Sequence, residues 1–521
     1  MKKEFIFQIS KSTAVRSEES VRIPFATSQM LLRVRLEKEY SGMGYLVVYD
    51  AFAHLYDQKG RVRLWHLLGH GERELLIGSG GKDTSVGGVP GSIEAGNWKI
   101  ELFLFTEYIA QFLGDAVVNF VIELETFEDE IAEEDGKMPF HVLDVIGDQE
   151  WVSKTSGRNQ MLPVLDHYDW KREVCRETMW YKGDFHTHTT LSDGKETTAS
   201  AMEKAKLTEL DFYVPTEHNA IHTGWVDTSL LILPGIEITT EQGHCNFFGI
   251  DRMPKVLPQL LEHVGDESSE RLMYEAIAEA KERNWIVSVN HPFLHIWKWK
   301  HGGLALQDMD CLEVINDPTY PYAKEANEQA VAFLDVLWED GWNIWGVGGS
   351  DSHNLLEERY DGAELPSIAG DPGTFVFCEG LSAAELMERV RRGNMYVSRF
   401  CMGAFEIFCS GNRYLPGDEL QFEEDTVSVE YHIRVYDTTE RICLYMIRDG
   451  RRELLRQTEE ADGSVTAEAK AEFRQGEWSY MRTEVRNEAG ELLAYVNPVY
   501  HGRKTHECMT FAEAVKKFEG R

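Results

Sequence analysis

The chain has 521 residues, which is too long for one ordinary domain and fits about three. Its composition, 43% hydrophobic and 27% charged, is typical of a folded globular protein and excludes collagen, coiled coil and a disordered chain. With 53 Lys and Arg against 88 Asp and Glu, the net charge is −35, which argues against a nucleic-acid polymer as partner. A small anion can still bind where a metal ion reverses the local field.

Neither a signal peptide nor a membrane-spanning helix is expected. The first ten residues contain no apolar stretch of the length that a signal peptide needs, and no run approaches the roughly 18 apolar residues of a spanning helix. The eight cysteines are scattered without a C-x-x-C pair, which is typical of reduced thiols rather than disulfides. We therefore expect a cytoplasmic protein with no membrane partner.

Residues 1–175 are predicted to form a β-sandwich. Apolar and polar residues alternate with a period of two in segments such as 31–40 and 44–57, and Gly-rich turns separate them, notably at 78–98. This pattern indicates several short strands rather than helices.

Residues 176–400 have the alternating strand and helix pattern of a parallel α/β domain, and the number of strands favours a barrel. Helical patterns cover residues 268–284, 323–341 and 381–394. Short apolar runs between them are the candidate buried strands: 211–219, 230–239, 244–250, 285–292, 311–317 and 343–353.

Residues 401–521 return to period-two patterns and are predicted to form a smaller β-sandwich with a helical tail. Asp449-Gly450 and Ala489-Gly490 are typical of hairpin turns. The two β-domains either bind a ligand or act as a scaffold that props the barrel and forms an oligomer interface. We favour the scaffold, because neither pattern concentrates polar or aromatic residues.

Nine histidines and carboxylates follow the ends of the candidate strands. Individually they mean little, since an H-x-H pair is expected by chance in a chain with 18 histidines. In a parallel barrel, however, the carboxyl ends of all strands meet at one face, where active sites are built. The nine candidate metal ligands are His186, His188, Asp193, His218, Glu237, His244, His291, Asp351 and His353.

A ligand set of imidazoles and carboxylates without thiolates favours Mn, Fe or Zn over Ca, and nine such groups suit two or three divalent ions. Two metals bridged by a carboxylate hold an ionised water and neutralise charge on the attacked oxygen. Phosphate-ester hydrolysis gains most from this arrangement. The sequence has no G-x-S-x-G elbow, no P-loop, and no G-x-G-x-x-G in a dinucleotide-binding context.

The motifs DFHTHTTLSDG, PTEHN, PGIEIT, GHCNFFGI, NHP and GGSDSH, in this order over about residues 180–400, resemble the polymerase-and-histidinol-phosphatase (PHP) superfamily of metal-dependent phosphoesterases. The resemblance implies a distorted (β/α)7 barrel with a trinuclear metal site. It also implies a metal pair bridged by Glu237, with His291 on the second metal and Asp351 as a further catalytic carboxylate. His186 and His188 would complete the pair. Asp193, His218, His244 and His353 would complete the cluster, including the third metal.

One position departs from the family pattern. The family usually has Thr-Asp-His where this chain has Thr216-Glu217-His218. We expect the longer acid to orient the imidazole of His218, so the change bears on the choice of metal.

The flanking patterns VVYDAFAHL, PGSIEAGNW, SYMRTEVRN and AYVNPVY are similar to the PHP branch that includes the carbaryl (carbamate ester) hydrolases. This similarity does not carry a substrate over to the present chain.

Two side chains are candidates for contact with the substrate. Arg399 either stabilises the anion or forms a surface ion pair, and His222 either lines the mouth of the site or is structural. Trp297 and Trp299, beside Lys298 and Lys300, either stack on a ring of the substrate or pack their loop against a neighbouring domain.

The sequence thus predicts a hydrolase that cleaves a small phosphate mono- or diester through a metal-bridging hydroxide, with Mn as the first expectation and Fe or Zn as alternatives. A carboxylic, carbamate or amide ester cleaved at the same site is the rival substrate. A non-catalytic metal-binding scaffold is the third reading, and a homo-oligomer stays open.

Overall fold

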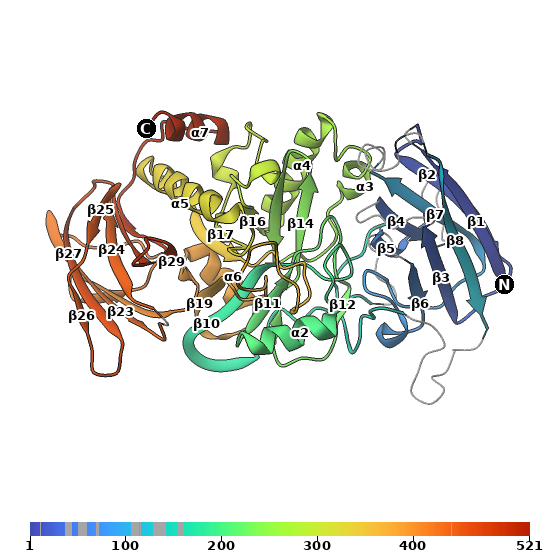
Figure 1. The fold of residues 1–521 in the computed structure, drawn as a ribbon, viewed down its shortest axis with the longest axis horizontal. Helices are drawn as coiled ribbons and strands as arrows, with labels where there is room; N and C mark the ends of the chain where they lie inside the picture. Colours follow the sequence, from blue (N-terminus) through green and yellow to red (C-terminus); the bar gives the residue numbers. More distant parts are fainter. Residues whose placement is uncertain are drawn as a thin grey trace.

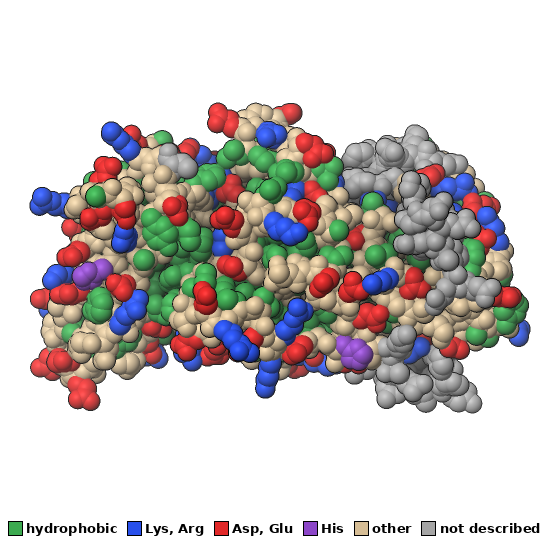
Figure 2. All heavy atoms as spheres, turned by 90° about the horizontal axis from the view of Figure 1, so that it is seen from below, with side chains coloured by type: hydrophobic (Ala, Val, Ile, Leu, Met, Phe, Trp, Pro, Cys, Tyr) green, Lys and Arg blue, Asp and Glu red, His purple; other side chains and the backbone are tan. Residues whose placement is uncertain are grey.

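The computed structural model describes residues 1–10, 12–36, 44–50, 60–68, 72–105, 114, 116–128, 142–153, 161–438 and 440–521. An N-terminal β-domain, a mixed α/β centre and a C-terminal β-domain follow one another along the long axis (Figure 1). On the face in Figure 2, basic side chains stand singly among acidic ones. Within the part of the chain that the structure describes, no helix is both long and apolar enough to cross a membrane.

The N-terminal domain consists of two four-stranded antiparallel sheets. One has the order β1 (Lys2–Ile9), β8 (Val118–Phe127), β3 (Gln29–Leu36), β6 (Arg73–Ile77). The other has the order β2 (Arg16–Ile23), β7 (Gly96–Leu104), β4 (Gly44–Tyr49), β5 (Val62–Leu68). Residues from both sheets share one hydrophobic core, in which Leu32 of the first sheet joins Ile100 of the second.

Seven strands of the centre are linked in a ring, which we call the seven-strand ring. In order they are β10 (Cys175–Thr187), β11 (Phe212–Pro215), β14 (Gly235–Thr240), β15 (Gly243–Phe248), β16 (Ile286–Val289), β17 (Cys311–Asn316) and β18 (Trp345–Gly349). Two links are single bridges: His218 to Glu237 joins β11 to β14, and Thr187 to Ser352 joins β10 to β18. Both bridges involve candidate ligands or their neighbours.

The ring is less regular than one helix after each strand. Helices α2 (Thr198–Leu207), α4 (Ser268–Glu282) and α5 (Ala323–Glu339) follow β10, β15 and β17. Strand β15 instead runs antiparallel to β14. The reason is the short connection between Thr240 and Gly243, because a parallel crossover needs a dozen or more residues. The coarse prediction of a mixed α/β centre flanked by antiparallel sheets is confirmed.

The C-terminal domain shares a sheet with the centre. Its separate sheet has the order β22 (Asn412–Tyr414), β21 (Met402–Cys409), β23 (Thr426–Tyr436), β27 (Val465–Arg474), β26 (Gln457–Glu459). The shared sheet runs from β10 through β19 (Gly373–Leu381), β20 (Met395–Ser398), β29 (Leu492–Val496), β28 (Ser479–Asn487) and β24 (Ile442–Arg448) to β25 (Arg451–Leu454). It crosses residue 400, where we placed the domain boundary. The terminal helix α7 (Phe511–Glu519) packs on α5.

Candidate metal centre

The predicted ligands meet at one end of the seven-strand ring. His186 lies at the end of β10, Glu237 lies within β14, and Asp351 comes two residues after β18. His244 differs from the expectation, because it stands at the start of β15 rather than after a strand. The hairpin brings it to the same end, since Thr239 of β14 pairs with His244.

Glu237 is the central carboxylate. Its Oε1 lies 3.3 Å from Nε2 of His186 and 3.1 Å from Nδ1 of His244. Its Oε2 lies 2.6 Å from Nδ1 of His218. Asn290 Nδ2 donates to Oε1 at 2.7 Å and fixes the orientation of the carboxylate. Glu237 therefore touches three imidazoles and stands at the middle of the cluster.

Two further carboxylates extend the cluster. Asp351 Oδ1 lies 3.3 Å from Nε2 of His186 and 3.1 Å from Nε2 of His188. Asp193 Oδ1 lies 3.4 Å from Nε2 of His218 and 3.3 Å from Nε2 of His353. Each of these two carboxylates thus contacts at least two imidazoles.

These contacts define three groups of side chains that could hold metal ions, with all ligand atoms of a group within 4.8 Å of one another. The groups are His186, His188 and Asp351; His218, Glu237 and His244; and His188, Asp193, His218 and His353. His291 is outside these groups, but its Nε2 lies 3.9 Å from Glu237 and 4.0 Å from Asp351. The structure therefore brings all nine predicted ligands together.

The residues present fit divalent metals. Within the described part of the chain, Nε2 of His186 and His188 and Oδ1 of Asp193 are buried without a hydrogen-bond partner. Buried polar atoms of this kind are costly unless something binds them. They point at one another across gaps of 3 to 4 Å, as ligand atoms around an ion do.

The pKa values of the candidate ligands are shifted in opposite directions. Burial and the neighbouring imidazoles of His353 and His218 lower the pKa of His188 to about 4. Burial also opposes protonation of His353, but Asp193 outweighs it and raises the pKa of His353 to about 10. Burial disfavours the Glu237 carboxylate, yet His218 and His244 hold its pKa well below the usual range. The three carboxylates are therefore available in their ionised, metal-binding form.

Glu313 is a supporting residue that the sequence analysis did not single out. Its Oε1 lies 3.0 Å from Nδ1 of His186, and its Oε2 accepts the backbone N–H of His291 at 2.9 Å. A carboxylate on the far nitrogen of a ligand imidazole fixes the tautomer and the ring orientation. The available signal was an isolated acid within the apolar run of β17, where a buried charge needs a specific partner.

Glu217 does not orient His218, which corrects our expectation. Its carboxylate accepts from the backbone N–H of Thr189 at 3.0 Å and from the hydroxyl of Ser192. It also contacts Nε2 of His222 at 2.9 Å. Glu217 faces the loop after β10, and His218 is held instead by Thr239, whose hydroxyl lies 2.7 Å from Nδ1.

The structure places the two candidate substrate residues away from the ligands. Arg399 forms a two-pronged ion pair with Asp371, at 2.7 and 2.9 Å, and lines a separate cavity beside Lys324 and Glu491. His222 is buried against Trp225 behind Glu217. Neither side chain is brought to the cluster, because each is already held by a buried or half-buried acid.

The two tryptophans after His291 separate into two roles. Trp299 is buried and packs on Phe511 of α7. Trp297 is 46% exposed, and its ring lies 5.9 Å from the ring of His244. Trp297 therefore belongs to the surroundings of the metal centre.

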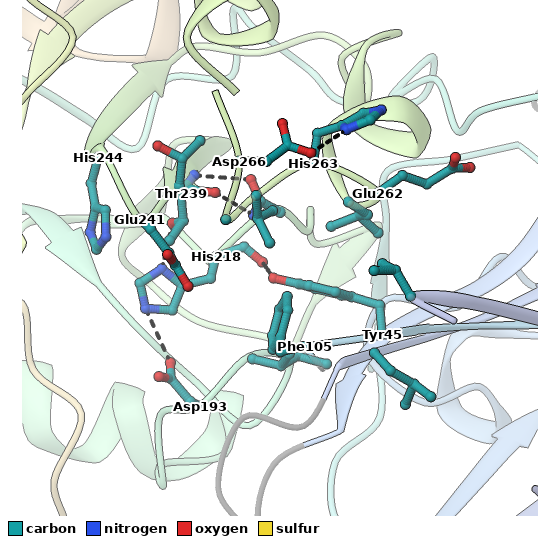
Figure 3. A pocket seen from close by; sticks show the side chains of 18 of the residues that line it. Tyr45, Phe105, Asp193, His218, Thr239, Glu241, His244, Glu262, His263 and Asp266 are labelled. Carbon is teal, nitrogen blue, oxygen red and sulfur yellow. Dashed lines mark hydrogen bonds and ion pairs between the residues drawn. The ribbon is translucent and has the colours of Figure 1, made fainter. Parts of the chain in front are cut away.

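A cavity of about 380 Å³ opens beside the centre. Asp193, His218 and His244 line its inner side, and Tyr45 and Phe105 of the N-terminal domain approach from the opposite side (Figure 3). The ligands on this side of the cluster are therefore accessible to a small molecule.

Comparisons with known proteins give partial structural matches. No known family model and no curated protein matches the sequence. A two-domain protein of Bacteroides vulgatus with a predicted PHP-like metal-dependent phosphoesterase is 18% identical, and the match covers 64% of this chain and 99% of that one, with a TM-score of 0.33. A candidate metal-dependent phosphoesterase of Bifidobacterium adolescentis is 17% identical over 35% and 91%, with a TM-score of 0.24. An amidohydrolase of Chromobacterium violaceum is 13% identical over 34% and 89%, with a TM-score of 0.22. These overlaps are too partial to assign a function, which we base on the residues of the centre.

Proposed function

We propose that the protein is a metal-dependent hydrolase of small phosphate mono- or diesters. The observation that carries this proposal is the convergence of nine imidazoles and carboxylates, eight of them in three overlapping groups and His291 beside them. When bound, two or three divalent ions would supply positive charge for an anionic ester and a water molecule ionised at neutral pH.

The chain's own residues prepare the site for this chemistry. Glu237 and Asp351 hold the imidazoles of His186 and His188 at fixed distances, and Glu313 holds His186 from behind. Burial of these groups keeps bulk water from competing for the ester oxygens, which strengthens every charge interaction at the site. Asp193, Glu237 and Asp351 contribute three negative charges, which suit more than one divalent cation.

A carbamate or carboxylic ester is the second candidate substrate. The observation that favours it is the charge of the adjoining cavity, whose described lining includes four carboxylates but no Lys or Arg. A neutral ester would not need a protein cation, whereas a phosphate would rely on the metals for all of its neutralisation.

The test is metal analysis combined with an ester panel. We expect the Mn²⁺-loaded protein to retain two or three ions per chain and to hydrolyse p-nitrophenyl phosphate or bis-p-nitrophenyl phosphate. His186→Ala should lose both properties, while His432→Ala, at a partly exposed histidine of the C-terminal domain, should keep both. Hydrolysis of 1-naphthyl N-methylcarbamate alone would select the second candidate. Less than one ion per chain and no turnover would refute the hydrolase.

A further inference from the structure

The cavity beside the metal centre is built by two domains. Its outer wall comes from the N-terminal β-domain, through Val15, Tyr45, Leu67, Leu104 and Phe105. Its inner side comes from the ligands Asp193, His218 and His244. Figure 3 shows Tyr45 and Phe105 entering from the N-terminal strands, opposite the imidazoles. A molecule bound to the ligands on this side therefore has the N-terminal domain as its nearest neighbour.

Two hydrogen bonds fix the position of the outer wall relative to the ligands. The hydroxyl of Tyr45 donates to the backbone carbonyl of His218 at 2.8 Å. The indole N–H of Trp65 donates to the carbonyl of Asn219, the next residue, at 3.0 Å. Both aromatic residues belong to the hydrophobic core that continues into the central domain. The wall is thus a fixed part of the site rather than a loosely apposed surface.

The chemistry of the lining is mainly apolar and aromatic. Phe105 packs edge-to-face on Tyr45, with ring centroids 5.7 Å apart at 89°. On the other side, Trp297 leaves nearly half of its surface exposed next to His244. Aromatic rings on both sides of a cavity are typical of sites that take a flat apolar group.

Apart from the ligand Asp193, the carboxylates of the lining are Glu241, Glu262 and Asp266, and the last two have positively charged or imidazole partners. Glu262 pairs with Arg16 at 3.0 Å, and Asp266 contacts Nδ1 of His263 at 2.7 Å. The described lining offers no Lys or Arg to a second anionic group. The part of the substrate that extends from the metals is therefore uncharged or positive.

We propose that this cavity seats the organic group of the ester, an apolar group of one or two aromatic rings, and that the N-terminal β-domain selects the substrate. The inference rests on the proposed function, because the ester group itself has to lie at the metals. The volume of about 380 Å³ lies within the range of about 300–1,000 Å³ found for small-molecule sites.

The test compares two ligands that differ only in the organic group. Phenylphosphonate and methylphosphonate carry the same anionic group and are not hydrolysed, so their affinities for the Mn²⁺-loaded full chain report on the cavity alone. We expect phenylphosphonate to bind at least about tenfold more tightly by titration calorimetry, since it buries a ring against apolar walls. Phe105→Ala and Trp297→Ala should each reduce this preference about threefold or more, with metal content unchanged.

Matched controls separate the cavity from general effects. Phe25→Ala removes a ring in the same domain that is 49% exposed, and Ile296→Ala changes the 56% exposed neighbour of Trp297. Neither residue lines the cavity, so both should keep the full preference. Equal affinities for the two phosphonates, no binding of either, or equal losses in the controls would overturn the inference.

Ester hydrolysis measured on the same samples distinguishes failure of the cavity proposal from failure of the proposed function. Turnover without preference for the phenyl ligand would refute the aromatic seat and leave the hydrolase standing. Preference for the phenyl ligand without turnover of any ester would refute the hydrolase and leave the seat standing.

Discussion

His188 and His353 lie in the same group of ligands with opposite protonation. The pKa of His188 is lowered to about 4, so this imidazole is neutral at pH 7 and ready to bind a metal. The pKa of His353 is raised to about 10 by Asp193, so without metal this imidazole keeps its proton at pH 7. A metal needs the neutral form and has to displace that proton.

Metal affinity should therefore rise with pH. Between pH 6 and pH 9 the proton on His353 becomes easier to remove, because the pH approaches its pKa from below. Calorimetric titration with Mn²⁺ in two buffers of different ionisation enthalpy measures the protons released at each pH. Affinity that is constant over this range, with no proton release, would contradict the prediction.

Glu313→Gln is expected to weaken metal binding without abolishing it. The amide can still contact His186, but it loses the negative charge that raises the basicity of the imidazole. Changes of this kind typically cost about 10- to 100-fold in metal affinity. Competition with a chelator measures the loss, and Glu357→Gln, on an exposed part of the chain, provides the control. Equal metal retention by both variants would show that Glu313 has only a structural role.

At the scale of elements, the joint between β10 and β18 depends on a glycine. A Cβ added at Gly349 would lie 2.2 Å from Cβ of His186 and 2.8 Å from its backbone nitrogen. Such contacts require the strands to separate, and His186 would then move relative to Asp351. Overpacking of this kind costs about 1–3 kcal/mol.

Gly349→Ala should therefore lower both the free energy of unfolding and the metal affinity. Denaturant titration and metal analysis measure the two effects. Gly520→Ala is a suitable control, because the nearest atom to its Cβ would lie at an ordinary 3.4 Å. A variant that loses stability but keeps full metal affinity would show that the joint does not position His186.

Most of the candidate ligands could be predicted from the sequence, because they lie near the ends of recognisable strands. The ligands from His186 to His353 lie in or shortly after strands that are recognisable as apolar runs, and strand ends gather at one edge. Three features were not predictable, because each depends on contacts between distant segments. These are the reversal of β15, the support of His186 by Glu313, and the approach of Tyr45 to His218. Arg399 followed a strand as expected, but Asp371 holds it elsewhere.

At the scale of the whole molecule, the centre and the C-terminal domain form one unit. The shared sheet crosses between them through the pairing of β20 with β29. Arg482 of β28 is fully buried and makes two contacts of 2.7 Å with Asp335 of α5. Because strands and a buried ion pair connect the two regions, we expect them to unfold in a single calorimetric transition.

Arg482→Ala should lower the temperature of that joint transition. The truncation leaves Asp335 without its buried partner, which costs about 3–5 kcal/mol. Differential scanning calorimetry measures the shift, with Arg441→Ala as control, since the side chain of Arg441 is 87% exposed. Two transitions, of which only one moves, would show that the regions unfold independently.

The candidate metal ligands and the outer wall of the cavity come from different segments of the sequence, so the two can evolve separately. All nine ligands lie between residues 186 and 353, whereas the outer wall comes from residues 15 to 105. Mutations in the codons for residues 15 to 105 can thus reshape the space for the organic group while the metal ligands stay intact. Natural variation or directed evolution confined to that stretch would change which organic groups fit the cavity while leaving the candidate metal ligands unaltered.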